Sequence, residues 1–304
     1  HKQMKITISF CTVCSLALLF CIELGGCSAQ DDKGDDPPKS SPRADASGID
    51  EMRANTNDET DDETQTGEVV EEVVADPLAK AIEKNEPLPA ALSAIGAKVT
   101  CDDDGRIIAL SLRETSITNE SLTLIAPHLD TLQSLDLSRT SITGNGLQAL
   151  GELANLRSLD VSEGKSKFVL HLDTGTSGME YFRVKDEDLT HIAACKGLTT
   201  LRLAHTDVSD AGLIHLSKLQ HLQDLDLSVT SVTGRGIALL VDGATSLKRL
   251  NLAGSQLSDV GLGYWPIQAM GEIEELDISK TQVTDDGLAH LTSLTNLKIL
   301  SISR

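Results

Sequence analysis

The sequence predicts an α/β solenoid, in which short parallel strands stack on one side and helices on the other. The first observation behind this prediction is the apolar pattern L-x-x-L-x-L, which recurs along the chain. It opens at Leu132, Leu156, Leu198, Leu222, Leu247, Ile273 and Leu297. Successive openings are 24, 42, 24, 25, 26 and 24 residues apart. The second observation is a hydroxyl residue at a fixed place after each pattern, and the third is a leucine-rich helical pattern after that.

The first half of each unit reads as a strand. In L-x-x-L-x-L the alternating apolar side chains point to one side while the intervening residues face solvent. An earlier copy opens at Ile107, so residues 107–304 hold about eight copies, of which the last stops after its strand. At the hydroxyl position, stacked side chains are expected to satisfy backbone groups of the turn. This position is occupied by Thr115, Thr140, Thr206, Thr230, Ser255 and Thr281.

The second half of each unit reads as a helix. It starts with Ser or Thr before an acidic or small residue. Where that residue is acidic, as in Ser209-Asp210, the pair is typical of a helix N-cap followed by a charge suited to the helix N-terminus. Leu213, Leu216 and Leu219 then fall on one helix face. Because no unit can bury both its strand and its helix alone, the copies must stack.

These units resemble the leucine-rich repeats of the ribonuclease-inhibitor-like and F-box-associated type, which share the T-D-x-G-L helix start seen from Thr284 onward as T-D-D-G-L. The chain looks most like the leucine-rich-repeat lipoproteins of bacteria. The resemblance covers about residues 97–304 and implies strands on a concave face, helices on a convex face and an activity that consists of binding. The chain has no F-box, and Thr or Ser replaces the cysteine at the family's hydroxyl position. A ubiquitin-ligase role is therefore not implied.

Residues 1–26 are predicted to be a secretory signal peptide, because Met4-Lys5 precedes an apolar stretch from Ile6 to Ile22. The stretch ends in Leu24-Gly25-Gly26-Cys27, which resembles the bacterial lipobox. That resemblance implies that Cys27 is acylated and anchors an exported protein to a membrane of the cell envelope, facing the periplasm or the exterior. Two alternatives are cleavage after Ala29, which would release the chain, and an uncleaved apolar anchor.

Residues 27–76 are predicted to form a disordered acidic linker. Between Asp31 and Asp76 there are sixteen acidic and four basic residues, so most of the net charge of −20 lies in this segment. Such a composition buries too little apolar surface to offset the entropy of ordering. The acidic balance argues against nucleic acid as a partner, because phosphates require a basic surface. A basic protein partner remains compatible with it.

Residues 77–106 are predicted to cap the first repeat. A helical pattern over 77–95 leads to an expected hairpin, in which Lys98–Cys101 and the first repeat strand flank the turn Asp102-Asp103-Asp104-Gly105. The three aspartates also allow a calcium-binding interpretation. A turn is favoured, because an EF-hand loop needs a longer acidic spacing and a distal Glu.

The first candidate site is the solvent-facing position between the last two strand leucines. It reads Ser111, Asp136, Asp160, Arg202, Asp226, Asn251, Asp277 and Ser301. Neighbouring strands lie about 4.8 Å apart, so Asp136 and Asp160 would repel one another without a nearby positive charge. The row is interpreted either as a docking ladder for a basic partner or as a simple preference of such repeats for L-D-L-S.

The second candidate site is an insertion of about eighteen residues in the third repeat, at 162–183. Its sequence predicts a protruding β-hairpin that carries Phe168, Tyr181 and Phe182. Aromatic residues on an exposed insertion are typical of binding hot spots, and packing against the repeats is the alternative.

Other residues give little indication of chemistry. His191, His215 and His290 share one register but have no carboxylate or cysteine with them to complete a metal site. Cys195 and Trp265 replace core leucines. With no catalytic constellation, cofactor motif or small-molecule substrate indicated, the sequence predicts a non-catalytic protein-interaction or envelope-scaffold module. The alternative is a secreted carbohydrate-binding protein or hydrolase that uses the concave groove.

Overall fold

The computed structural model describes residues 5–6, 77–84, 86–171, 176–241, 243–244 and 246–303. Of two compact units, Cys11–Val73 lies outside the described residues, and the account below concerns the other. The predicted acidic linker, including Cys27, also lies outside the described residues. So does the predicted signal peptide, except for residues 5–6. No helix in the described ranges has the length and apolar character needed to cross a bilayer.

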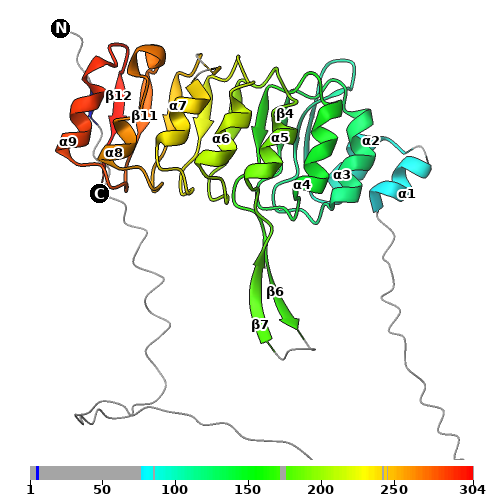
Figure 1. The fold of residues 1–304 in the computed structure, drawn as a ribbon. Helices are drawn as coiled ribbons and strands as arrows, with labels where there is room; N and C mark the ends of the chain where they lie inside the picture. Colours follow the sequence, from blue (N-terminus) through cyan, green and yellow to red (C-terminus); the bar gives the residue numbers. More distant parts are fainter. Residues whose placement is uncertain are drawn as a thin grey trace, which may run out of the picture. The chain divides into compact units, whose positions relative to one another are not determined.

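The fold is a leucine-rich-repeat solenoid, as predicted (Figure 1). Its ten-stranded sheet has the order β1-β12-β11-β10-β9-β8-β5-β4-β3-β2, in which only the β2–β3 pair is antiparallel. The repeat strands are β3 (Ile107–Ser111), β4 (Ser134–Asp136), β5 (Ser158–Asp160), β8 (Thr200–Arg202), β9 (Asp224–Asp226), β10 (Arg249–Asn251), β11 (Glu275–Asp277) and β12 (Ile299–Ser301). The two end strands are β1 (Lys5–Ile6), which pairs with β12, and β2 (Lys98–Cys101).

Short helices follow the strands and lie together on one side of the sheet (Figure 1). The α-helices are α3 (Asn119–Ile125), α4 (Gly144–Leu147), α5 (Leu189–Ile192), α6 (Asp210–Leu216), α7 (Arg235–Val241), α8 (Asp259–Leu262) and α9 (Asp285–Leu288). The 3-10 turns are η1 (Ala126–His128), η2 (Gln148–Glu152), η3 (Asp186–Asp188), η4 (Ile267–Met270) and η5 (Ala289–Ser293). Before the repeats, α1 (Pro77–Glu83) and α2 (Leu88–Ala94) precede the β2–β3 hairpin.

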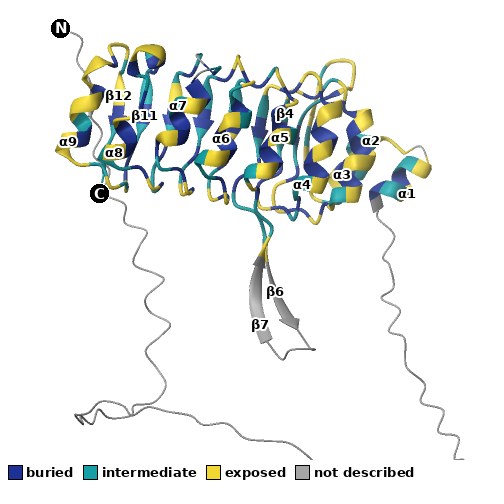
Figure 2. Cartoon of the chain, viewed as in Figure 1, coloured by how far each residue is buried: buried dark blue, intermediate teal, exposed yellow. Residues whose placement is uncertain are grey.

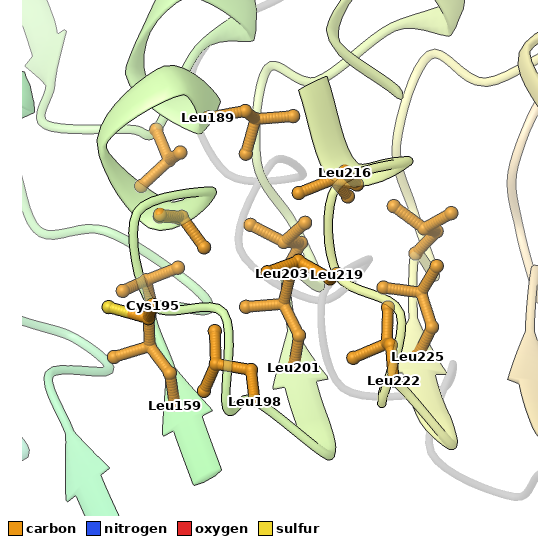
Figure 3. Packing of buried hydrophobic residues seen from close by; sticks show 14 of the residues in the cluster. Leu159, Leu189, Cys195, Leu198, Leu201, Leu203, Leu216, Leu219, Leu222 and Leu225 are labelled. Carbon is orange, nitrogen blue, oxygen red and sulfur yellow. The ribbon is translucent and has the colours of Figure 1, made fainter. Parts of the chain in front are cut away.

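The core lies between the sheet and the helices (Figure 2). The strand register places the central leucines of successive repeats side by side, so that Leu201 lies opposite Leu159 on one neighbour and Leu225 on the other. Figure 3 shows these side chains packed beneath Leu216 of α6. Leu219, which was expected on the same helix face, is also buried but lies after the end of α6 at Leu216. Each repeat therefore contributes one layer to a shared apolar interior, which no repeat could form alone.

The hydroxyl side chain closes the turn after five of the repeat strands. The hydroxyls of Thr115, Thr140, Thr206, Thr230 and Thr281 each donate to the carbonyl three residues earlier at 2.6 Å. The residue immediately before this position of the repeat has a positive φ in seven repeats. In only one of the seven is that residue a glycine, Gly254. The backbone amide of this positive-φ residue donates a hydrogen bond to a carbonyl of the next repeat, as the Val229 amide does to the Ala253 carbonyl at 2.8 Å. This bond requires the left-handed backbone even where the side chain disfavours it.

The helix starts are joined by a clamp that the sequence did not reveal. Asp186 accepts hydrogen bonds from the Ser209 amide at 2.8 Å and the Ser209 hydroxyl at 2.6 Å, although Ser209 belongs to the next repeat. Asp210 binds Thr233 and Asp259 binds Thr284 in the same way. Asn119 makes the equivalent contact with Thr143, in which its Oδ1 accepts the Thr143 amide and its side-chain amide donates to the Thr143 hydroxyl.

We expected the acidic residue after the cap to act on its own helix, and its side chain instead bonds to the following one. The close approach also accounts for glycine in the G-L motif. A Cβ at Gly212 would lie 2.4 Å from the Asp186 carboxylate, and one at Gly287 would lie 2.2 Å from the Asp259 carboxylate.

Candidate interaction surfaces

The predicted row of polar residues forms one continuous line across the strands, on the face of the sheet opposite the helices, which we call the open-face row. The register pairs Ser111 with Asp136, Asp136 with Asp160, and so on to Ser301. Arg202 is exposed and stands in register between Asp160 and Asp226, so a positive charge separates two of the carboxylates.

Every acidic side chain of the open-face row accepts a hydrogen bond from the turn that follows its strand. The Oδ1 atoms of Asp136, Asp160, Asp226 and Asp277 each accept the amide two residues later at 2.9 Å. Asn251 does the same with the Ala253 amide at 3.0 Å. The recurrence of L-D-L-S therefore has a local cause, since an Asp or Asn side chain holds the turn after each strand.

The second carboxylate oxygen distinguishes these aspartates. Asp136 also accepts the Ser138 hydroxyl at 2.6 Å, and its Oδ2 accepts the Ser111 hydroxyl at 2.8 Å. Among the described residues, no hydrogen bond reaches the Oδ2 atoms of Asp160, Asp226 and Asp277. These three carboxylates are half-buried and keep one oxygen open to a partner.

Charged residues beside the row are paired across neighbouring strands in the C-terminal part. Arg249 Nε donates to Asp224 at 2.9 Å, and this bond raises the pKa of Arg249. Lys298 donates to Glu274, and the bond lowers the pKa of that carboxyl. Arg249 and Asp224, but not Lys298 and Glu274, line a shallow hollow of about 270 Å³, together with the members of the open-face row from Arg202 to Ser301. Exposed pairs of this kind add little stability, typically about 0–1 kcal/mol each.

The insertion forms an antiparallel hairpin, β6 (Ser166–His171) and β7 (Thr176–Tyr181), which projects away from the repeats (Figure 1). The side chain of Phe168 lies outside the described part of the chain, whereas Tyr181 is 52% exposed and Phe182 is half-buried. The Arg183 guanidinium lies 4.6 Å from the centre of the Tyr181 ring and also bonds to Asp207 at 3.2 Å. The structure thus holds Tyr181 and Arg183 together at the hairpin base.

The acidic turn before the first repeat is closed by Arg106. The Asp102 carboxylate accepts the Arg106 amide at 2.8 Å and the Arg106 side chain at 3.0 Å, and this amide bond is the main reason why the pKa of Asp102 is lowered. Asp104 also binds Arg106 at 2.9 Å. These contacts agree with the favoured turn interpretation.

The predicted core substitutions are buried. Cys195 is 5% exposed, its thiol donates to the Leu150 carbonyl, and burial raises its pKa to about 11. Trp265 is also buried, and its indole N–H donates to the Gly234 carbonyl at 3.1 Å. Within the described ranges, no three His, Cys, Asp or Glu side chains are placed to hold a metal ion.

Comparison with known families agrees with this fold. The family model described as Leucine Rich repeat matches residues 128–151, 194–217, 243–264 and 273–291. The second of these segments contains β8 and α6, a complete strand and helix of one repeat. A comparison with curated proteins gives no match.

Among solved structures, the chain is similar to two internalins of Listeria monocytogenes. With the first, InlF, it shares 19% identity over 65% of this chain and 48% of the internalin chain, at a TM-score of 0.49, so it spans about half of that protein. With internalin C2 it shares 22% identity over 75% and 92% of the two chains, at a TM-score of 0.46. The plant peptide hormone receptor RGFR1 in complex with RGF2 shares 19% identity over 67% and 30%, at a TM-score of 0.38.

Proposed function

We propose that the protein is a non-catalytic protein-interaction module or scaffold of the bacterial cell envelope, and that the open-face row binds a basic partner. The observation that carries the proposal is the difference in bonding between the aspartates of the row. Asp160, Asp226 and Asp277 need only one carboxylate oxygen for the turn, and the other remains open. Carboxylates in register across a sheet suit a partner that presents Lys or Arg along its surface.

The test replaces Asp160, Asp226 and Asp277 with Asn in the full chain. Asn keeps the acceptor that the turn needs, as Asn251 demonstrates, and removes only the charge. With a fluorescein-labelled lysine–glycine peptide as the probe, three exposed ion pairs at about 0.5 kcal/mol each correspond to roughly a tenfold weaker Kd.

The matched control makes three Asp→Asn changes at Asp58, Asp61 and Asp62, which alter the net charge equally. Asp136→Asn is a second control, because that carboxylate is already satisfied. Equal weakening by the row variant and the linker control would show that the peptide responds only to net charge, and the proposed binding role of the row would then fail.

We further propose that the chain is exported and anchored through a lipid on Cys27, as its resemblance to bacterial repeat lipoproteins implies. The support is the apolar stretch from Ile6 to Ile22 followed by Leu24-Gly25-Gly26-Cys27. Metabolic labelling with an alkyne fatty acid in a bacterial host is expected to mark the wild type and not Cys27→Ser. A labelled Cys27→Ser chain, or a wild type found entirely in the soluble fraction, would exclude this anchor.

A further inference from the structure

Arg202 is the only basic member of the open-face row. It lies on β8, in register with Asp160 of β5 on one side and with Asp226 of β9 on the other. Its side chain is exposed, and within the described part of the chain it forms no hydrogen bond and no ion pair. The row therefore changes sign at Arg202 and changes back on the next strand.

The two neighbouring aspartates do not pair with Arg202. Their Oδ1 atoms accept the turn amides of Ser162 and Ser228 at 2.9 Å. Arg249, which lines the same shallow hollow, differs in this respect, because its Nε donates to Asp224 at 2.9 Å. The charge of Arg202 thus remains available to a molecule that binds along the row.

The strand residues beside this part of the row do not alter its charge pattern. Ser158 and Thr200 lie on the same face of the sheet, two residues before the row members of β5 and β8, and neither is charged. A partner that lies across β5, β8 and β9 therefore meets a negative, a positive and a negative charge in turn. If it presented basic residues only, one of them would face Arg202, and like charges in contact oppose binding.

The strand spacing favours a helix as the binding element of the partner. Successive members of the row lie about 4.8 Å apart. An α-helix rises about 1.5 Å per residue, so side chains at alternating intervals of three and four residues are about 5 Å apart on one face. In an extended segment, side chains on one face are about 6.8 Å apart and lose the register of the row after two strands.

We propose that Arg202 determines which basic partner binds, by selecting a helix that presents one acidic residue between basic residues. Basic side chains of the helix bind the open carboxylate oxygens of Asp160, Asp226 and Asp277, and its acidic side chain binds Arg202. Arg202 repels a helix with a basic residue at that place, so specificity comes from a repulsive contact as well as from attractive ones. The inference rests on the proposed function, in which the open-face row binds a basic partner.

The experiment uses the full chain and two fluorescein-labelled, alanine-based helical peptides of identical composition. Each peptide has five variable sites at alternating intervals of three and four residues. The first carries Lys, Glu, Lys, Gln and Lys in this order, which complements the row from Asp160 to Asp277. The second carries Glu, Lys, Lys, Gln and Lys. Because both peptides have the same net charge, a difference in Kd reports the position of the Glu.

We expect the wild type to bind the first peptide about tenfold more tightly than the second. The second peptide replaces an attractive pair by a like-charge pair both at Asp160 and at Arg202. These are four electrostatic differences of nearly a factor of two each. Arg202→Gln removes the two that involve Arg202 and should reduce the preference to about threefold. Arg202→Glu reverses these two, and should leave the Kd values of the two peptides within about twofold of each other.

The matched control is Lys218→Glu, which makes the same change of charge at an exposed lysine just after α6, on the helix side of the repeats. It alters the attraction of both peptides alike, so the tenfold preference should remain. Far-UV circular dichroism compares the fold of each variant with that of the wild type.

Three results would overturn the selective role of Arg202: no binding of the first peptide to the wild type, equal binding of the two peptides, or a tenfold preference that persists in Arg202→Glu. The proposed function is tested separately by the variant with Asn at Asp160, Asp226 and Asp277, which should weaken binding of both peptides. If that variant weakens both while the wild type does not distinguish them, the row binds basic partners without selection by Arg202, and only this inference fails.

Discussion

Asp186→Ala is expected to weaken the junction between the third and fourth repeats. The Asp186 carboxylate accepts two hydrogen bonds from Ser209, at 2.8 Å from the amide and 2.6 Å from the hydroxyl. Both residues are half-buried, and a net contribution of about 1 kcal/mol per bond gives a loss of about 2 kcal/mol. In a folded region of this size, that loss lowers the Tm by roughly 4–8 °C.

The chain itself supplies the control for this change. Asn119 makes the equivalent clamp, in which its Oδ1 accepts the Thr143 amide at 3.0 Å and its amide group donates to the Thr143 hydroxyl at 2.9 Å. Asp186→Asn should therefore keep both bonds to Ser209 and lose less than about 0.5 kcal/mol.

Urea unfolding followed by far-UV circular dichroism measures the two variants and the double variant with Ser209→Ala. If Ser209→Ala and Asp186→Ala act on the same bonds, their combined loss is expected to be smaller than the sum of the two single losses. Equal losses for the Ala and Asn variants of Asp186, or full additivity with Ser209→Ala, would refute the clamp as the cause.

Three other changes test the core, the turn and the buried thiol. Leu225→Ala, at a fully buried strand position, is expected to lose about 2–5 kcal/mol in urea unfolding, and the same change at the 46%-exposed Leu239 under about 1 kcal/mol. Val229→Gly, which relieves a β-branched residue at φ 54°, should raise the free energy of unfolding in urea by about 0.5 kcal/mol, since Gly254 fills the equivalent position; a lower free energy of unfolding would contradict the strain argument. Burial raises the pKa of Cys195 from 9.0 to about 11, so between these pH values the thiol ionises in the unfolded chain and stays protonated in the folded one. The free energy of unfolding of the wild type should therefore fall by up to about 2–3 kcal/mol relative to that of Cys195→Val as the pH rises from about 9 to about 11. If the free energies of unfolding of the two proteins change in parallel with pH, this prediction is wrong.

The leucine register determined the architecture from sequence. Alternation within L-x-x-L-x-L specifies which side chains are buried, and a repeat of about 24 residues leaves stacking as the way to bury them. The hydroxyl that closes each turn was also predictable, because Thr140 bonds to Leu137 within its own repeat. Contacts between residues close in the chain are encoded locally and do not depend on how the repeats stack.

Only the tertiary structure divided the open-face row. The sequence placed Asp136, Asp160 and Asp226 in one register without distinguishing them. The structure adds that Ser111, in the preceding repeat, satisfies the second oxygen of Asp136. Ser111 lies beside Asp136 because of the strand pairing, and not because the two residues are close in the sequence.

The clamp between repeats has the same origin. Asp186 and Ser209 are 23 residues apart, and their atoms meet only when two helix starts stack in one particular offset. A sequence signal was present, since a polar residue at the helix start recurs with glycine in the next repeat, as Asp186 does with Gly212. Periodicity shows that such residues repeat, but the few tenths of an ångström that decide a hydrogen bond are set by the packing of whole repeats.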